Sequence, residues 1–212
     1  MAGTKKPRKP RLKAVTQPTI VASEVRELKA FYDGAGQMPD FGYARFYWPV
    51  GTGPRESILL RLIKKRRPAA AESEIDTAAR VEALVPSDAP EDYTDPDFLA
   101  RRYEETLAAD ETTAYAQVTL RFPSTIANLH HPYEVARTWL REFYVLGKGA
   151  PVLAILHAPC RVGSDNPVHL HAAIFPKRLG KFGFVSPARE LASDAGCLEA
   201  YKAWEAFKAG RL

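Results

Sequence analysis

The sequence is poor in cysteine and histidine and has no long apolar segment. Two cysteines in 212 residues, Cys160 and Cys197, are too few for a disulfide scaffold, and their isolation argues against a cysteine-rich zinc site. No apolar run approaches the roughly 20 residues that a membrane-spanning helix requires. The N-terminal residues also lack the apolar centre of a secretory signal. We therefore expect a cytoplasmic protein with no membrane partner.

The formal net charge of +5 is unevenly distributed along the chain. Residues 1–13 carry six Lys or Arg and no acid, whereas residues 72–111 carry thirteen Asp or Glu against three Arg. A segment this charged cannot bury enough apolar surface to offset the cost of ordering, so residues 1–13 are predicted to be a disordered arm. The arm is either a solubilising terminus or, as we favour, a segment that binds DNA phosphates. The arm cations expected to contact phosphates are Lys5, Lys6, Arg8, Lys9 and Arg11.

Residues 14–212 are expected to form one domain, within which residues 71–96 are an acidic, Pro-containing connector. Helical spacing and end signals predict helices over residues 23–34, 75–84, 96–110, 132–147 and 193–209. Apolar alternation or short apolar runs predict strands over residues 43–50, 114–122, 150–158, 168–175 and 183–185. Residues 55–67 fit either a helix or a strand. This order of elements predicts an α+β fold, an antiparallel sheet with helices packed on it.

Three of the five histidines fall within residues 155–178, "ILHAPCRVGSDNPVHLHAAIFPKR". Side chains at positions i and i+2 of a strand share a face, so His169 and His171 project together, followed by Ala173. His157 ends the preceding apolar strand and can reach them if the two strands pair antiparallel. Three neutral imidazoles would then form a nitrogen face for a divalent cation. A single histidine on an apolar strand is usually a core residue, but three in this arrangement favour a functional cluster.

Other polar residues near this segment have predicted roles around the cluster. Asp165 and Asn166 can accept a ring N–H and fix the tautomer of a ligand histidine. Three cations beyond the second strand are expected to contact DNA phosphates: Lys177, Arg178 and Lys181. The basic run of residues 64–67 is either a solvated helix end or a DNA contact. His130 and His131 precede a Pro-started helix and are predicted to be structural or surface residues.

The segment "ILHAP…DNPVHLHAAIFPKRLGKFGF" resembles the histidine motif of the MobA/MobL-type plasmid mobilisation relaxases. That family has a His ending one strand, a short loop with Asn-Pro, and a His-x-His strand. The segments "VPSDAPEDYTDPDFLARRYEETLAADETTAYAQVTLRFPS", "WLREFYVLGKGAPVLAILH" and "ARELASDAGCLEAYKAWEAF" resemble the parts of the family around that motif. The likeness covers roughly residues 85–207, and the His motif is its most specific part.

The resemblance implies a relaxase of the HUH type, whose central antiparallel strand carries His-x-His. It implies that His157, His169 and His171 hold a divalent metal, Mn²⁺ or Mg²⁺, that polarises the scissile phosphate of single-stranded plasmid DNA. It also implies an attacking tyrosine that becomes a 5′-phosphotyrosine, and accessory mobilisation proteins as partners. The nearest match to the nucleophile is Tyr32 in "SEVRELKAFYDGAG", with Tyr43 and Tyr47 as rivals.

Two departures from the family pattern leave alternatives open. The family has Asn-Pro directly before its first His of His-x-His, whereas Val168 intervenes here, and the tyrosine motif near the N-terminus is not matched cleanly. The chain is therefore also compatible with a degenerate member, a DNA-binding protein that keeps the scaffold without cutting. A histidine-triad nucleotide hydrolase is a third possibility, weakened because Ala173 stands at the third triad position.

Overall fold

The fold is built on one six-stranded antiparallel sheet, seen in a computed structural model that describes residues 26–29, 40–49, 54–66, 78–122, 129–162 and 164–212. The strands lie in the order β1-β2-β4-β6-β5-β3, and every neighbouring pair is antiparallel. In chain order they are β1 (Arg26–Lys29), β2 (Phe41–Tyr47), β3 (Ala78–Leu84), β4 (Thr113–Arg121), β5 (Val152–His157) and β6 (His169–Ile174). A separate hairpin pairs β7 (Lys177–Gly180) with β8 (Gly183–Pro187).

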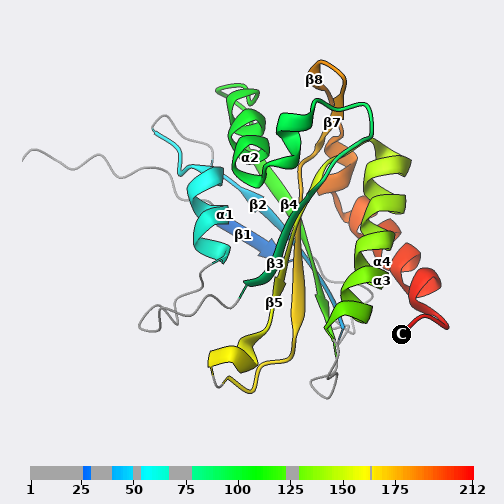
Figure 1. Ribbon diagram of the computed structural model, residues 1–212. Coiled ribbons are helices and arrows are strands. Elements are labelled where there is room, and N and C mark those ends of the chain that lie inside the picture. Colours follow the sequence, from blue (N-terminus) through cyan, green and yellow to red (C-terminus); the bar gives the residue numbers. More distant parts are fainter. Residues whose placement is uncertain (1–25, 30–39, 50–53, 67–77, 123–128, 163) are drawn as a thin grey trace, which may run out of the picture.

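Helices cover both faces of this sheet, with α1 and α2 on one side and α3 and α4 on the other (Figure 1). They are α1 (Ile58–Arg66), α2 (Pro96–Glu105), α3 (His130–Leu140) and α4 (Asp194–Lys208). Short turns are η1 (Glu91–Thr94), η2 (Arg141–Leu146, a π-helical turn), η3 (Pro159–Val162) and η4 (Arg189–Ala192). None of the described helices has the length and apolar character needed to cross a bilayer.

Two hydrophobic cores follow from the alternation of side chains along the central strands. Leu170 and Ala172 of β6 face the α3–α4 side and pack in a core with Trp139 and Trp204. Ala173 faces the α1–α2 side, where the core includes Leu62 of α1 and Leu99, Ala100 and Tyr103 of α2. Because both faces of β5 are covered, all six of its residues are buried, which explains its continuous apolar sequence.

Local signals place the helix ends where the sequence predicts them. The side chain of Asp95 accepts a hydrogen bond from the backbone N–H of Phe98 at 2.6 Å, and Pro96 occupies the first turn of α2. Ser193 caps α4 in the same way, through the backbone N–H of Gly196 at 3.1 Å. The predicted helices over residues 96–110, 132–147 and 193–209 are thus confirmed, with α2 ending five residues early.

Two of the helix predictions are wrong, and both errors concern edge strands. Residues 26–29 lie in β1, paired with β2, and residues 78–84 lie in β3, paired with β5. Both segments are rich in Glu, Arg, Ala and Leu, which favour helices locally, but strand pairing overrides that preference. The predicted acidic connector therefore contributes a full strand to the sheet. The short strand β7 was not predicted.

The other predicted strands are confirmed, and residues 58–66 form a helix, one of the two options that the sequence allowed. The sheet is antiparallel, helices pack on it, and β6, with its His-x-His, lies between β4 and β5 in the interior of the sheet. The α+β fold class predicted from the sequence is therefore confirmed, including the central position of this strand.

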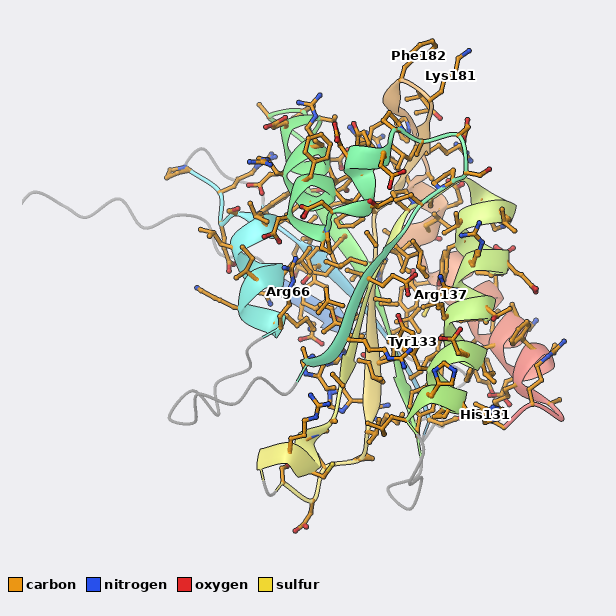
Figure 2. All side chains as sticks on the ribbon, in the orientation of Figure 1. Arg66, His131, Tyr133, Arg137, Lys181 and Phe182 are labelled. Atoms are coloured by element: carbon orange, nitrogen blue, oxygen red, sulfur yellow. The ribbon has the colours of Figure 1, made fainter. Side chains whose placement is uncertain are left out.

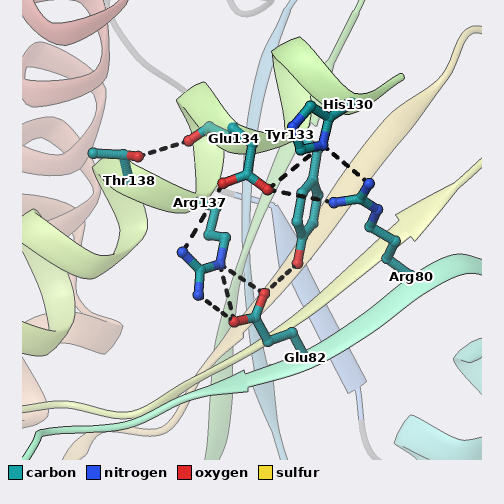
Figure 3. Close-up of polar contacts among 7 residues, drawn as sticks. All are labelled: Arg80, Glu82, His130, Tyr133, Glu134, Arg137 and Thr138. Atoms are coloured by element: carbon teal, nitrogen blue, oxygen red, sulfur yellow. Dashed lines mark hydrogen bonds and ion pairs between the residues drawn. The ribbon is translucent and has the colours of Figure 1, made fainter. Parts of the chain in front are cut away.

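A polar network joins α3 to the edge strand β3 (Figure 3). The carboxylate of Glu82 accepts three hydrogen bonds from the guanidinium of Arg137, two from Nε at 2.9 and 2.8 Å and one from Nη2 at 2.7 Å. It accepts a further one from the hydroxyl of Tyr133 at 2.6 Å. Nearby, Arg80 contacts Nδ1 of His130 at 3.1 Å. His131 contacts the carbonyl oxygen of Arg211 at 3.0 Å through Nε2. Both of these histidines make local contacts at the start of α3, which agrees with the structural role predicted for them.

Candidate functional site

The pairing of β5 with β6 brings the three predicted histidines together. His157, the last residue of β5, lies directly opposite His169, the first residue of β6, and His171 lies opposite Ile155. The ring centroids are 5.2 Å apart for His157 and His169, 5.3 Å for His157 and His171, and 4.8 Å for His169 and His171. All three rings are on the face of the sheet covered by α1 and α2, and they lie at the end of the sheet next to η3.

Burial favours the neutral form of the imidazoles of His169 and His171. His157 is only 2% exposed, while His169 and His171 are partly buried. Burial lowers the pKa of His169, and the charges of Arg121 and Lys65 add to this effect, whereas the hydrogen bond that the ring donates to the Pro167 carbonyl raises it. Burial also lowers the pKa of His171 well below its ordinary value, and Lys65 acts in the same direction. A neutral imidazole is the form that binds a metal ion.

The contacts that orient two of the rings come from residues that the sequence did not single out. Nδ1 of His169 lies 2.8 Å from the carbonyl oxygen of Pro167, and therefore carries the proton, which leaves Nε2 as the nitrogen with a lone pair. Nδ1 of His171 lies 3.0 Å from Oγ1 of Thr119 and 3.2 Å from the amide nitrogen of Gln117. Both polar groups come from β4, which pairs with β6 on the other side from β5.

The prediction that Asp165 and Asn166 orient these rings is wrong for His169 and His171. Both residues are exposed in the loop before β6. The backbone N–H of Asn166 donates a hydrogen bond to the hydroxyl of Ser164, at 3.3 Å. The loop does orient His169, but through the backbone carbonyl of Pro167. A carbonyl role of this kind leaves no signature in the residue type, so sequence reasoning could not have found it.

Two cations beside the cluster were also not assigned to it from sequence. Arg121, the last residue of β4, lies directly opposite His169 in the ladder, and its side chain is exposed. A Cβ atom on Gly42 would lie 3.4 Å from both terminal nitrogens of Arg121, so the guanidinium reaches across the neighbouring strand. Lys65 comes from α1, which lies above this face of the sheet, and its charge lowers the pKa of both His169 and His171. In the sequence, Lys65 stood out only as part of the basic run of residues 64–67, which was either a solvated helix end or a DNA contact.

The cations predicted from the segment after β6 lie elsewhere. The hairpin of β7 and β8 is at the opposite end of the sheet from η3 (Figure 1), and Lys181 projects from its tip beside Phe182 (Figure 2). Lys177 donates a hydrogen bond to the hydroxyl of Thr106 at 3.2 Å, and Arg178 forms an ion pair with Glu190 at 2.9 Å. These three cations therefore lie apart from the histidine cluster. Whether they contact DNA at their own end of the sheet stays a prediction.

The candidate tyrosines separate clearly from one another. Tyr43 is buried on the α3–α4 face, where its hydroxyl donates a hydrogen bond to the carbonyl of Leu191, and burial raises its pKa. Tyr47 ends β2 at the end of the sheet away from the histidines. Neither rival can therefore serve this cluster. The lead candidate, Tyr32, lies outside the described residues, as do Lys5, Lys6, Arg8, Lys9 and Arg11 of the basic arm.

Three imidazoles are suitable ligands for a divalent metal, but the present orientations of the rings do not direct their nitrogens toward a common point. The described side chains contain no group of three His, Cys, Asp or Glu residues arranged to hold a metal ion. The rings of His157 and His169 stack with 23° between their planes, and that of His171 meets them edge-on. Stacked rings direct their nitrogens side by side, whereas ligation needs them to converge. Rotation about χ2, a soft torsion in histidine, is the change that ligation requires.

Comparisons with known proteins agree with this architecture. No protein-family model matches the sequence, and no curated protein is significantly similar to it. A similar fold occurs in a structure described as the molecular basis of vancomycin resistance transfer in Staphylococcus aureus, with a TM-score of 0.53 and 17% sequence identity. The match covers 65% of this chain and 71% of the other. At this level of identity the likeness shows a shared α+β fold, in agreement with the fold class that the sequence predicts.

Proposed function

We propose that this protein is a metal-dependent relaxase of the MobA/MobL type, which nicks single-stranded plasmid DNA at a transfer origin during mobilisation. The observation that carries the proposal is the meeting of His157, His169 and His171 on one face at the end of the central strand. The similarity of the fold to a structure described for resistance transfer supports the same assignment. Accessory mobilisation proteins would be its partners at the origin.

In this proposal the three imidazoles would hold Mn²⁺ or Mg²⁺, which as a Lewis acid supplies positive charge to the scissile phosphate. The Pro167 carbonyl holds His169 in the tautomer that leaves Nε2 with its lone pair. Gln117 and Thr119 hold the His171 ring from the other side. The ring of His157 is almost fully buried, whereas His169 and His171 are partly exposed, so a ligand would approach the cluster from the side of β6.

The nucleophile in this proposal is Tyr32. It follows Lys29, the last residue of β1, by three residues, a chain length that spans about 10 Å when extended. Strand β1 runs toward the histidine end of the sheet, because Arg26 pairs with Tyr47 whereas Lys29 pairs with Ala44. The tyrosine oxygen would form a bond to phosphorus as the bond to the 3′ oxygen breaks. The phenol proton ends on the released 3′-hydroxyl, and the 5′ phosphate stays on the tyrosine.

The alternative is a DNA-binding protein that does not cut. The ring orientations favour it, because the described residues contain no ready ligand arrangement. The departure "NPVHLH" from the family motif points the same way. The two functions differ in whether a covalent adduct forms.

The proposal is tested by incubating the protein with single-stranded oligonucleotides from a plasmid transfer origin and Mn²⁺, then resolving denatured products on a gel. We expect a protein–DNA adduct that is lost in Tyr32→Phe and in His169→Ala. His131→Ala, which removes an imidazole from α3, serves as the matched control and should still form the adduct. Binding without any adduct would favour the non-cutting alternative, and an adduct that survives His169→Ala would overturn the role of the cluster.

A further inference from the structure

The charges that act on the histidine rings are positive, although one of the cations, Lys65, is itself under the influence of Glu27 on β1. Within the described residues, the guanidinium of Arg121 makes no hydrogen bond or ion pair. Nζ of Lys65 lies 5.6 Å from the centroid of the Phe46 ring, and the charges of Glu27 and Arg61 also act on it. The charges that act on the pKa of His169 and His171 are all cationic. No acidic group among the described residues acts on the pKa of either imidazole, so the electrostatic field at these rings is positive and suits an anion.

The backbone of Asp40 contacts that of Arg121, but the carboxylate of Asp40 is directed away from Arg121. The carbonyl oxygen of Asp40 accepts a hydrogen bond from the backbone N–H of Arg121 at 2.8 Å, but its carboxylate pairs with Lys208 of α4. Helix α4 packs on the opposite face of the sheet. The fold therefore neutralises Asp40 on one face and leaves Arg121 without a carboxylate on the other.

The position of Arg121 suits a ligand that lies across the imidazoles. Its Cα lies opposite that of His169, which in turn lies opposite His157, so the three residues form one row across β4, β6 and β5. Gly42 leaves room for the guanidinium on the adjacent strand. Lys65 approaches the same face from above, on α1, and burial lowers its pKa to about 8 even though the charge of Glu27 acts to raise it.

We propose that Arg121 and Lys65 form an anion-binding site that takes a phosphodiester group of nucleic acid against the three imidazoles. The inference deepens the proposed function, since it names the residues that hold the phosphate, but the phosphate contact itself does not need the metal. Guanidinium and ammonium groups are the usual partners of phosphate oxygens. The same two charges would repel a metal ion that arrives alone, so an anion and a metal should favour each other's binding.

The test uses Arg121→Gln and Lys65→Met, which remove one charge each while keeping similar volume. Binding of a fluorescein-labelled oligothymidylate is measured without metal over a range of salt concentrations. We expect each change to weaken binding about tenfold, as for a lost hydrogen bond to a charged group. The slope of log Kd against log salt should fall by about 0.7 per change. Inorganic phosphate as competitor tells whether the site takes any phosphate or requires the diester of a chain.

Lys202→Gln removes an exposed cation from α4, on the other side of the sheet, and is the matched control for net charge. Equal effects of Lys202→Gln and Arg121→Gln on the salt slope would overturn the inference. Arg121→Lys keeps the charge and should keep the slope. If Lys65→Met does not fold, Arg121→Gln alone decides, because the Arg121 side chain is exposed.

A second measurement follows the affinity for Mn²⁺, on which the same substitutions should have the opposite effect. Titration calorimetry with Mn²⁺ and no DNA should show that Arg121→Gln and Lys65→Met bind the metal several-fold more tightly than the unchanged protein, because repulsion is relieved. A merely structural role for these residues would not tighten metal binding. If no variant binds Mn²⁺ while the salt slopes still fall, the proposed metal function fails and the anion site stands. If the metal binds and the slopes are unchanged, the anion site fails alone.

Discussion

The two ends of the sheet carry cations in different states. At the hairpin end, Arg178 is paired with Glu190 and Arg189 with Glu111. At the histidine end, Arg121 and Lys65 have neither hydrogen bonds nor ion pairs within the described residues. The hairpin end has more basic residues close together in the sequence, but both of these arginines are paired with acidic residues of the protein itself. The comparison teaches that the positive charge available to a ligand depends on pairing in three dimensions and not on the number of basic residues in a stretch.

The largest effect is expected from removing the histidine cluster itself. His169→Ala together with His171→Ala should lower the affinity for Mn²⁺ by 100-fold or more, because each ligand lost removes a coordinate bond. Titration calorimetry checks the affinity, and a melting curve checks that the sheet still forms. Retention of tight Mn²⁺ binding in the double variant would place the metal elsewhere and break the comparison.

Gly183 in the hairpin should be the next most sensitive position. Its φ is +100°, and a Cβ there would lie 2.7 Å from the hydroxyl oxygen of Tyr93. Gly183→Ala should lower the free energy of unfolding by about 1–3 kcal/mol, through backbone strain and this contact. Urea denaturation gives the loss, and metal and DNA binding should be unchanged in the folded variant. A change in DNA affinity would mean that the two ends do not act separately.

Glu82 tests what a paired charge contributes. Glu82→Gln should lower the free energy of unfolding at pH 7 by about 1–2 kcal/mol, because the carboxylate accepts hydrogen bonds from Arg137 and Tyr133. Burial acts to raise the pKa of Glu82, but these hydrogen bonds and the charges of Arg137 and Arg80 outweigh it and lower the pKa.

A lowered carboxyl pKa contributes stability that is fully present above the unfolded value of 4.5 and is lost as the pH falls through the folded value. The difference in stability between the unchanged protein and Glu82→Gln should therefore shrink below about pH 4.5. Denaturation curves from pH 3 to 7 follow the difference. A gap that widens in acid would contradict the assignment of the charge to Glu82.

The smallest effect is expected at Arg178. Arg178→Gln should cost about 0.5 kcal/mol of stability, typical of an exposed ion pair, and should change the salt slope of DNA binding less than Arg121→Gln does, because its charge is already paired with Glu190. Under the same conditions Arg121→Gln should change the slope and not the stability. Equal slopes for the two variants would erase the difference between the ends of the sheet.

Elements with strong periodicity could be predicted from the sequence, and edge elements could not. The strands that carry the histidines have apolar runs of strand length, and α4 has a Ser cap and a helical stripe, so local signals sufficed. Strands β1 and β3 contain residues that favour helices, and only their pairing partners make them strands. Partner choice is a property of the whole chain and is invisible in a short window.

The same distinction applies to the candidate site. His169 and His171 could be assigned to one face because a strand fixes the direction of side chains two residues apart. Arg121, Gln117 and Thr119 could not be assigned, because their place beside the imidazoles depends on the register between β4 and β6. Sequence reasoning instead selected cations close along the chain, at Lys177 and Arg178, which the fold carries to the far end of the sheet.

The direct pairing of His157 with His169 separates the geometry of the imidazoles from the length of the loop between them. Hydrogen bonds of the ladder hold both strands, so residues inserted among positions 160–166 would extend the loop outward and leave the register intact. Grafting of longer loops at this place is thus a route to altered DNA preference without rebuilding the chemical centre. Variation in this loop is also where natural diversification could occur at the lowest cost to the fold.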